Sequence, residues 1–211
     1  MKNNVFVFNH PLINHKLAVI RNICTETSEF KKNVKEIANL MVYEATRDLP
    51  VEKVNVETPC GISNSEVVSK KVVIIPILRA GLGMVEGISE YIPDASVGYL
   101  GLYRDEETLE PKEYYCKLPS DIADAYVLLV DPMLATGGSV IHALDVLNRY
   151  GVEDKNIKYL GIVGAPEGLE NVSNHHPEVA IYLAALDCKL NEKGYIVPGL
   201  GDCGDRLFGT K

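Results

Sequence analysis

The sequence has few cysteines, and none is placed for a zinc site or a disulfide framework. Its 211 residues include five cysteines, at positions 24, 60, 116, 188 and 203, an odd number without a Cys-x-x-Cys pair. Structural zinc sites commonly use cysteine pairs such as Cys-x-x-Cys, and disulfide-stabilised small domains depend on paired cysteines. We therefore expect neither feature, and we expect a reducing, cytoplasmic location.

Long apolar runs and an excess of basic residues are also missing. Residues 1–16 lack the apolar core of a signal peptide, and no run reaches the roughly 20 residues of a membrane-spanning helix. Lysine and arginine number 21 against 29 acidic residues, for a net charge of -8. Broad binding to nucleic acid or to an acidic membrane requires a basic surface. The sequence therefore predicts no membrane segment and no nucleic-acid partner.

The remaining composition is that of an ordinary globular protein, with 46% hydrophobic and 24% charged residues. The length fits a single domain over residues 1–211, and we find no internal repeat or low-complexity segment. Apolar runs alternate with stretches of helical spacing, which predicts an α/β fold with a central parallel sheet flanked by helices. We expect strands at 5–8, 54–58 (an edge strand), 72–75, 127–130, 158–163 and 179–183, and helices at 12–23 and from Thr27 or Ser28, as the cap, to 45.

Histidines provide no convincing metal site. His10 and His15 are expected at the surface or in capping positions. The adjacent pair His175 and His176 has no further ligands at a usual spacing, so we expect a loop there.

The stretch 127–139 has the pattern of a phosphate-binding turn. Four apolar residues end at Asp131, and the loop Ala135-Thr136-Gly137-Gly138-Ser139 leads into a helical pattern. Glycines let the backbone approach a phosphate, and helix amides point at it. No lysine follows the glycines, and Gly-x-Gly-x-x-Gly is absent, which excludes a Walker loop and a dinucleotide fingerprint. An acid before such a loop suits a sugar phosphate, with the carboxylate on the ribose hydroxyls.

A second strand-to-helix turn follows residues 72–75, with Arg79 and two glycines. Arginine offers a planar, permanently charged fork for an anion, although a surface ion pair is an equally simple interpretation. Because the protein is acidic overall, an anionic substrate would need such a local positive field.

Two further segments complete the pattern. Residues 97–103 and 114–119 flank a charged insert and predict a hairpin or flexible arm. The C-terminal tail is rich in glycine but carries apolar anchors, so its ordered backbone could present amides and carbonyls to a flat ligand. A packed, irregular C-terminus is the alternative.

Three separated motifs resemble the uracil phosphoribosyltransferase family of type I phosphoribosyltransferases. They are Leu78-Arg79-Ala80-Gly81, the nine residues from Asp131 to Ser139, and Gly-Tyr-Ile-Val-Pro-Gly-Leu-Gly-Asp at 194–202. The resemblance extends from the opening His-Pro-Leu to the terminal Phe-Gly-Thr-Lys. It implies a type I phosphoribosyltransferase-like α/β fold, a β-arm or flexible catalytic loop, and a C-terminal hood over about residues 187–211.

The resemblance also implies the site. The residues implied to bind phosphoribosyl diphosphate (PRPP) are Arg79, Ala80, Gly81, Arg104, Asp131, Pro132, Met133, Leu134, Ala135, Thr136, Gly137, Gly138, Ser139 and Asp202. Those implied to bind uracil are Ile196, Gly201, Asp202 and Cys203. Arg79, Arg104 and Asp131 are the implied catalytic residues.

The implied reaction is the attack of uracil N1 on C1 of the PRPP ribose, which gives UMP and pyrophosphate. Magnesium is expected to be held mainly by PRPP and water, because Asp131 is followed by Pro132 and not by a second acid. The family also implies activation by GTP and a dimer or tetramer. Cys203 departs from the usual alanine, and its thiol could narrow the pocket or make it oxidant-sensitive.

Two other functions remain open. A phosphoribosyltransferase for a purine would need a larger pocket and would not be expected to carry this tail. A nucleotide sensor or RNA-binding regulator on the same fold is disfavoured by the net charge of -8 and the complete motif set.

Overall fold

The computed structural model describes residues 4–104 and 111–210, apart from the side chains of Arg104 and Pro111. The predicted Arg104 contact and most of the charged insert therefore lie outside the described residues. The elements are β1 (Val5–Val7), α1 (Pro11–Arg21), α2 (Thr27–Ala45), β2 (Val51–Thr58), β3 (Gly61–Val68), β4 (Val72–Leu78), α3 (Leu82–Ser89), β5 (Ser96–Val97), β6 (Tyr99–Arg104), β7 (Pro111–Lys117), η1 (Ile122–Asp124), β8 (Tyr126–Val130), β9 (Met133–Leu134), α4 (Gly138–Arg149), η2 (Asp154–Asn156), β10 (Ile157–Gly164), α5 (Pro166–His175), β11 (Ala180–Leu186), β12 (Lys189–Leu190), β13 (Ile196–Val197) and α6 (Cys203–Phe208).

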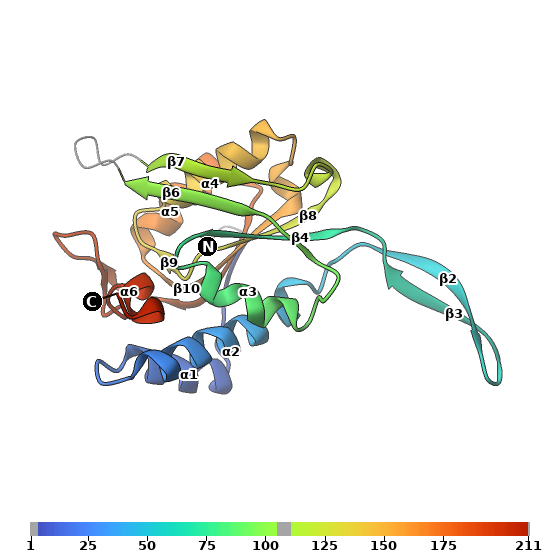
Figure 1. Cartoon of the computed structure of the whole chain (residues 1–211), viewed down its shortest axis with the longest axis horizontal. Coiled ribbons are helices and arrows are strands. Elements are labelled where there is room, and N and C mark those ends of the chain that lie inside the picture. Colours follow the sequence, from blue (N-terminus) through green and yellow to red (C-terminus); the bar gives the residue numbers. More distant parts are fainter. Residues whose placement is uncertain (1–3, 105–110, 211) are drawn as a thin grey trace.

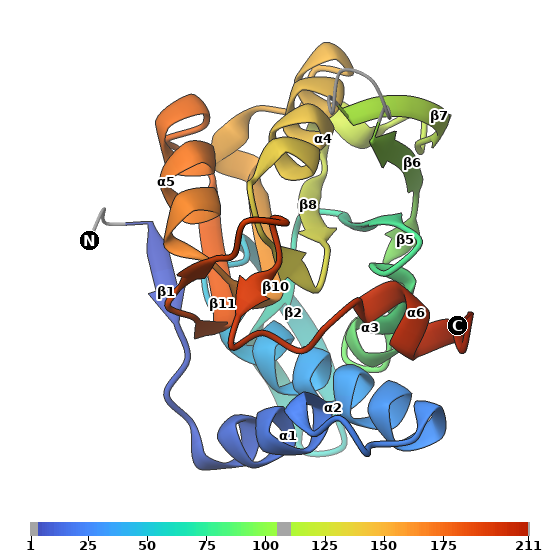
Figure 2. The same cartoon turned by 90° about the vertical axis from the view of Figure 1, so that its left-hand side faces the viewer.

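A central sheet with the order β1-β11-β10-β8-β4-β6-β7 forms the frame, and its strands are parallel except for the antiparallel pair β6–β7. The unbroken apolar runs at 72–75 and 127–130 lie in β4 and β8, as predicted. They are apolar at every position because helices cover both faces of the sheet. In β8, Leu128 and Val130 pack into the core that contains α1, α2 and α3, and Val127 and Leu129 pack against α4. This alternation is the period of two expected for a strand buried on both faces. Figures 1 and 2 show the helices on either side of the sheet.

The strand prediction for residues 54–58 is correct, but these residues do not join the central sheet. They lie in β2, which pairs with β3 in a separate two-stranded hairpin that projects from the body (Figure 1). We call this β2–β3 hairpin the β-arm; it is distinct from the predicted hairpin around the charged insert, which β6 and β7 form as an antiparallel pair. All its side chains are exposed or partly exposed, so the sequence offers no strong apolar face that would reveal its partner strand.

Two local predictions need correction. α2 begins at Thr27 with Glu26 as its N-cap, and neither Thr27 nor Ser28 makes the predicted cap. His175 is the last residue of α5 and not in the predicted loop, whereas His176 follows the helix as predicted. His176 is 6% exposed, and its Nδ1 lies 2.9 Å from Asp154 Oδ2. His10 does act as a cap, since its Nδ1 accepts a hydrogen bond from the Leu12 amide.

The C-terminal hood, which the structure describes over residues 187–210, contains a short helix that the sequence pattern did not predict. Asp202 caps α6 by accepting a hydrogen bond from the Asp205 amide at 2.9 Å, and Gly209 ends it at a φ of 64°. Arg206 then donates to the carbonyl oxygens of Ile20 and Leu200. The hood is therefore bound to the end of α1, beside the C-terminal edge of the sheet (Figure 2). Within residues 4–104 and 111–210, no helix has the length and apolar character to span a membrane.

Candidate active site

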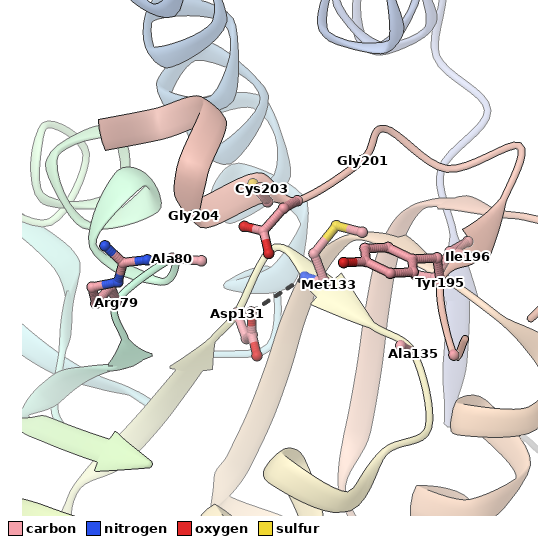
Figure 3. Close-up of a pocket in the computed structure, with 12 residues that line it drawn as sticks. Arg79, Ala80, Asp131, Met133, Ala135, Tyr195, Ile196, Gly201, Cys203 and Gly204 are labelled. Carbon is pink, nitrogen blue, oxygen red and sulfur yellow. Dashed lines mark hydrogen bonds between the residues drawn. The ribbon is translucent and has the colours of Figure 1, made fainter. Parts of the chain in front are cut away.

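A cavity of about 300 Å³ opens at the C-terminal edge of the sheet, between the ends of β4 and β8 and the hood. Open parallel sheets present ligand sites at this edge. The cavity is lined by Arg79, Ala80, Asp131, Met133, Ala135, Gly194, Tyr195, Ile196, Gly201, Asp202, Cys203 and Gly204 (Figure 3).

Asp131 lies at the bottom of this cavity, directly after β8. Its Oδ1 accepts a hydrogen bond from the Met133 amide at 3.3 Å, and its backbone carbonyl accepts one from the Tyr159 hydroxyl at 2.8 Å. Burial raises the pKa of the carboxyl from 3.8 to about 7, and the Met133 amide only partly opposes this shift. Among the described residues only the Met133 amide donates to this carboxylate, so its other acceptor positions can receive hydrogen bonds from hydroxyl groups of a ligand.

The predicted phosphate loop has the expected backbone. Gly137 has a φ of 84°, and a Cβ there would lie 2.9 Å from the Gly168 carbonyl oxygen, so a side chain would be strained and crowded. α4 begins at the next residue, and the first amides of a helix lack intrahelical acceptors. The Asn171 side chain donates to the Thr136 carbonyl at 2.9 Å. α5 thus supports the loop from behind, although it was not predicted to do so.

Arg79 lines the cavity on the side opposite Ala135 and the predicted phosphate loop (Figure 3). Its Nη2 lies 3.4 Å from Asp205 Oδ1, and its guanidinium carbon is 5.9 Å from the Phe208 ring centroid. The side chain remains 55% exposed, so these contacts orient the guanidinium without burying it. Gly81 lets this turn pack closely against β8, because a Cβ there would lie 2.5 Å from the Val130 carbonyl oxygen.

The residues of the predicted uracil site all reach the cavity. Ile196, Gly201, Asp202 and Cys203 form its hood side. Cys203 is only 2% exposed and belongs to the core cluster on the α2 face, and burial raises the pKa of its thiol. A protonated, buried thiol is a poor nucleophile, so the structure gives no support to the oxidant-sensitive site considered above.

The structure separates the predicted PRPP residues into two groups. Arg79, Ala80, Asp131, Met133, Ala135 and Asp202 line the cavity itself. The others adjoin it in the turn after β4, in the segment from Pro132 through β9 to the loop, and at the start of α4: Gly81, Pro132, Leu134, Thr136, Gly137, Gly138 and Ser139. The Arg104 side chain lies outside the described part of the structure.

Sequence reasoning missed Tyr195, whose ring lies beside Met133 in Figure 3. Asn191 Oδ1 accepts hydrogen bonds from the amides of Lys193 and Tyr195, at 3.0 and 2.9 Å. This turn presents the tyrosine to the cavity. The Asn-x-x-Gly-Tyr sequence, an Asx-type turn before the Ile-Val strand, was the available signal.

No preformed metal centre is visible in the part of the chain that the structure describes. Residues 4–104 and 111–210 contain no group of three histidine, cysteine or acidic side chains that could hold an ion. Asp131 and Asp202 both contribute to the cavity, and their oxygens are ligands suited to magnesium.

The chain resembles proteins of one family over almost its whole length. The family model described as "Uracil phosphoribosyltransferase" matches residues 7–210. The chain is 60% identical over 208 residues to a Bacillus licheniformis protein named uracil phosphoribosyltransferase, covering 98% of this chain and 99% of that one. It is 58% identical over 212 residues to a Thermoanaerobacter protein of the same name, covering all of both chains.

Solved structures agree with the fold. The AQ2163 protein of Aquifex aeolicus has a TM-score of 0.91 and 39% identity, with 98% of this chain and 99% of that chain covered. Adenine phosphoribosyltransferase from Trypanosoma brucei has a TM-score of 0.60 at 14% identity, covering 94% and 88% of the two chains, which shows the fold alone. The predicted type I phosphoribosyltransferase fold is confirmed, and the chain belongs to the uracil phosphoribosyltransferase family.

Proposed function

We propose that this chain transfers the phosphoribosyl group of PRPP to uracil, as a step of pyrimidine salvage. The supporting observation is that three segments far apart in the sequence meet at one cavity: the Arg79 turn, the loop after Asp131 and the C-terminal hood. In the reaction, the bond between C1 and the pyrophosphate oxygen breaks, the C1–N1 bond forms, and the N1 proton ends on the released pyrophosphate. The products are UMP and pyrophosphate.

The loop after β8 binds the ribose 5-phosphate part of PRPP in this proposal. The amides at the start of α4 receive the 5′-phosphate, with hydroxyl groups from Thr136 and Ser139 nearby in the sequence. Asp131 accepts hydrogen bonds from the ribose hydroxyls. A bound ribose with its magnesium would favour the ionised carboxylate, whose pKa is otherwise raised to about 7.

Arg79 and Arg104 act on the pyrophosphate. Negative charge builds on this group as the C1–O bond breaks, and a guanidinium stabilises it through charge-assisted hydrogen bonds. Arg79 is exposed toward the cavity and is held only at 3.4 Å by Asp205, so its fork remains available to the ligand. Magnesium, held by PRPP and water, supplies further positive charge.

The hood binds uracil through Ile196, Gly201, Asp202 and Cys203. Uracil presents one donor and two carbonyl acceptors, and backbone groups can pair with them. Positioning of the base over C1 then supplies much of the rate enhancement.

The β-arm supports a proposal about assembly. Five of its apolar side chains are at least 40% exposed: Val51, Val56, Ile62, Val67 and Val68. An isolated two-stranded hairpin is marginally stable in water, and exposed apolar side chains gathered on one element indicate a contact surface. We therefore propose a homo-oligomer, a dimer or tetramer, in which the β-arm packs on a second copy. The cysteine pattern supports the separate proposal of a cytoplasmic location. Sedimentation of Ile62→Lys should show a smaller species, whereas an unchanged species would contradict this use of the arm.

The reaction is tested by pyrophosphate release from PRPP and magnesium with uracil, cytosine, hypoxanthine or no base. Release with uracil alone is the expected result. Release with another base would retain the PRPP site and contradict the assignment of the hood. GTP, proposed as an activator, is added in a parallel series, and no release in either series would contradict the enzymatic function.

A further inference from the structure

The hood loop that lines the cavity is held from behind by an ion pair that does not touch the cavity. Arg21, the last residue of α1, donates to both carboxylate oxygens of Asp187, at 2.6 and 2.8 Å. The Asp187 side chain is only 6% exposed and the Arg21 side chain 24%. A bidentate pair at this depth has one well-defined geometry.

Both backbone polar groups of Gly199 are bound to this ion pair. The Gly199 amide donates to Asp187 Oδ2 at 2.8 Å, and the Gly199 carbonyl accepts from Arg21 Nη1 at 2.8 Å. We call this arrangement the Gly199 clamp.

Gly199 lies midway between the hood residues assigned to uracil. Ile196 precedes it by three positions and Gly201 follows it by two, and both line the cavity. The turn is tight, with Gly199 at a φ of 61° and a virtual Cβ 2.2 Å from the Ile196 carbonyl oxygen. A shift of the Gly199 peptides would therefore be passed to the cavity wall on both sides.

We propose that Arg21 and Asp187 are positioning residues for the acceptor base, acting through Gly199. The inference rests on the proposed function and deepens it. A pocket that binds a flat base through backbone groups cannot correct its geometry by changing side-chain rotamers. Its precision must come from residues that fix the backbone, and a misplacement of about 1 Å can reduce a rate roughly 100-fold.

The decisive measurement is a comparison of the KM for uracil with the KM for PRPP. Asp187→Asn keeps the side-chain volume, but it removes the negative charge and puts an amide NH2 donor where Oδ1 accepts from Arg21 Nη2 or where Oδ2 accepts from Arg21 Nη1 and the Gly199 amide. We expect the KM for uracil to rise about tenfold, while the KM for PRPP stays within about twofold. Arg21→Lys keeps the charge with fewer directed donors, so it should fall between the wild type and Asp187→Asn.

A purely structural role predicts a different result. Loss of folded protein lowers the apparent kcat but leaves both KM values unchanged. Glu36→Gln is the matched control, because Glu36 forms an ion pair with Lys16 of α1 that makes no contact with the hood. This control should leave both KM values at wild-type levels.

The outcomes separate the two proposals. Absence of wild-type turnover with uracil would overturn the proposed function and with it the assignment of the clamp to uracil. Normal wild-type turnover with an unchanged uracil KM in Asp187→Asn and Arg21→Lys would overturn the clamp alone. An equal rise in both KM values would also overturn it, since the effect would then not be specific to the base.

Discussion

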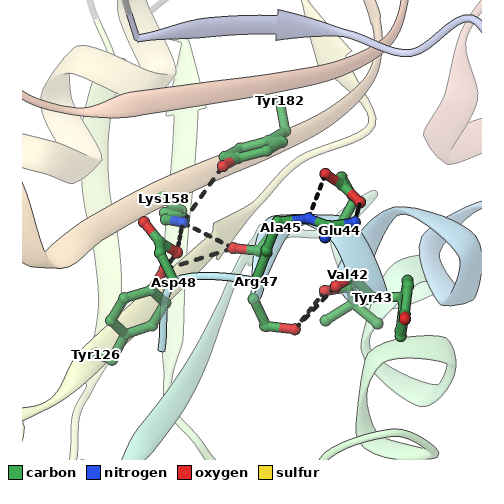
Figure 4. Close-up of polar contacts among 10 residues, drawn as sticks. Val42, Tyr43, Glu44, Ala45, Arg47, Asp48, Tyr126, Lys158 and Tyr182 are labelled. Carbon is green, nitrogen blue, oxygen red and sulfur yellow. Dashed lines mark hydrogen bonds and ion pairs between the residues drawn. The ribbon is translucent and has the colours of Figure 1, made fainter. Parts of the chain in front are cut away.

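The neighbouring strands β8 and β10 carry charged groups at opposite edges of the sheet, and these groups have opposite surroundings. At the C-terminal edge, Asp131 accepts one carboxylate hydrogen bond from the described residues, that of the Met133 amide. At the N-terminal edge, the Lys158 side chain is 4% exposed and its Nζ donates to Asp48, to the Ala45 carbonyl at 2.8 Å and to the Tyr182 hydroxyl at 3.3 Å (Figure 4).

The aromatic surroundings reinforce this contrast. Lys158 Nζ lies 5.4 Å from the Tyr126 ring centroid and 5.2 Å from that of Tyr182, within the range of cation–π attraction. Because a buried charge is tolerated when its hydrogen bonds are satisfied, this lysine is structural and fixes the end of α2. The carboxylate with few partners is the one in the cavity. The comparison teaches that hydrogen-bond satisfaction, more than burial alone, separates a structural charge from one that is open to a ligand.

The largest expected effect is on catalysis by Asp131→Asn. The amide keeps the shape but loses the charge that would accept from ribose hydroxyls, so kcat/KM for PRPP should fall at least about 100-fold. Steady-state kinetics with uracil would measure this loss. Lys158→Met is the control at the other edge, and its kcat/KM should remain near the wild-type value. Near-normal turnover by Asp131→Asn would contradict the assignment.

The second prediction concerns pH and stability. The Asp131 carboxyl has a folded-state pKa of about 7, above its ordinary value of 3.8. Between these values the folded state binds more protons than the unfolded state, so the free energy of unfolding falls as pH rises. Between about pH 4 and pH 7, ionisation of this carboxyl should lower the free energy of unfolding by roughly 1–4 kcal/mol, with the lower part of that range favoured because Asp131 is partly exposed.

Urea denaturation of the wild type and Asp131→Asn would measure that loss. The variant should gain stability relative to the wild type as the pH is raised from about 5 to about 8. A constant difference between the two proteins across this range would show that Asp131 is ionised in the folded state throughout.

A smaller effect is expected from Lys158→Ala. The change leaves a cavity and removes the donor to the Ala45 carbonyl, so the free energy of unfolding should fall by about 3 kcal/mol. Lys158→Met refills most of the space and should lose only about 1–2 kcal/mol. Thermal and urea denaturation would give both values. A large loss of uracil turnover in folded Lys158→Met would break the distinction between the two edges.

The smallest effect is expected from Tyr126→Phe, which deletes one hydroxyl of the same network. This hydroxyl donates to Asp48 Oδ1 at 3.1 Å, and its removal should lower the free energy of unfolding by about 1 kcal/mol. Tyr43→Phe, at a side chain that is 69% exposed, should change nothing measurable. Equal losses in the two variants would show that the Tyr126 hydroxyl has no special role.

The sequence predicted features that depend on local pattern. Unbroken apolar runs predicted β4 and β8, because strands buried on both faces need apolar residues at every position. Asp131 and the glycines after it predicted the strand–loop–helix turn, because backbone at positive φ favours glycine.

Other features followed weaker or distant signals. The β-arm has no buried face, so β3 gave no clear period. His176 is the predicted loop residue, but the sequence did not predict that Asp154 of η2 and Asp145 of α4 would lie against its ring. Lys158 was expected within a strand, but the residues next to it in the sequence do not indicate that its ammonium group is buried against the end of α2.

By itself the sequence determined the α/β layout, the glycine-containing turn after Asp131 and the family, since these are set by residue types at short, fixed spacings. Tertiary structure decided which charges lie paired and which lie open to a ligand. It also decided that Tyr195 lines the cavity and that Arg21 reaches Gly199 across 178 positions. Such contacts depend on how helices and strands pack, and burial and hydrogen-bond partners exist only once that packing has formed.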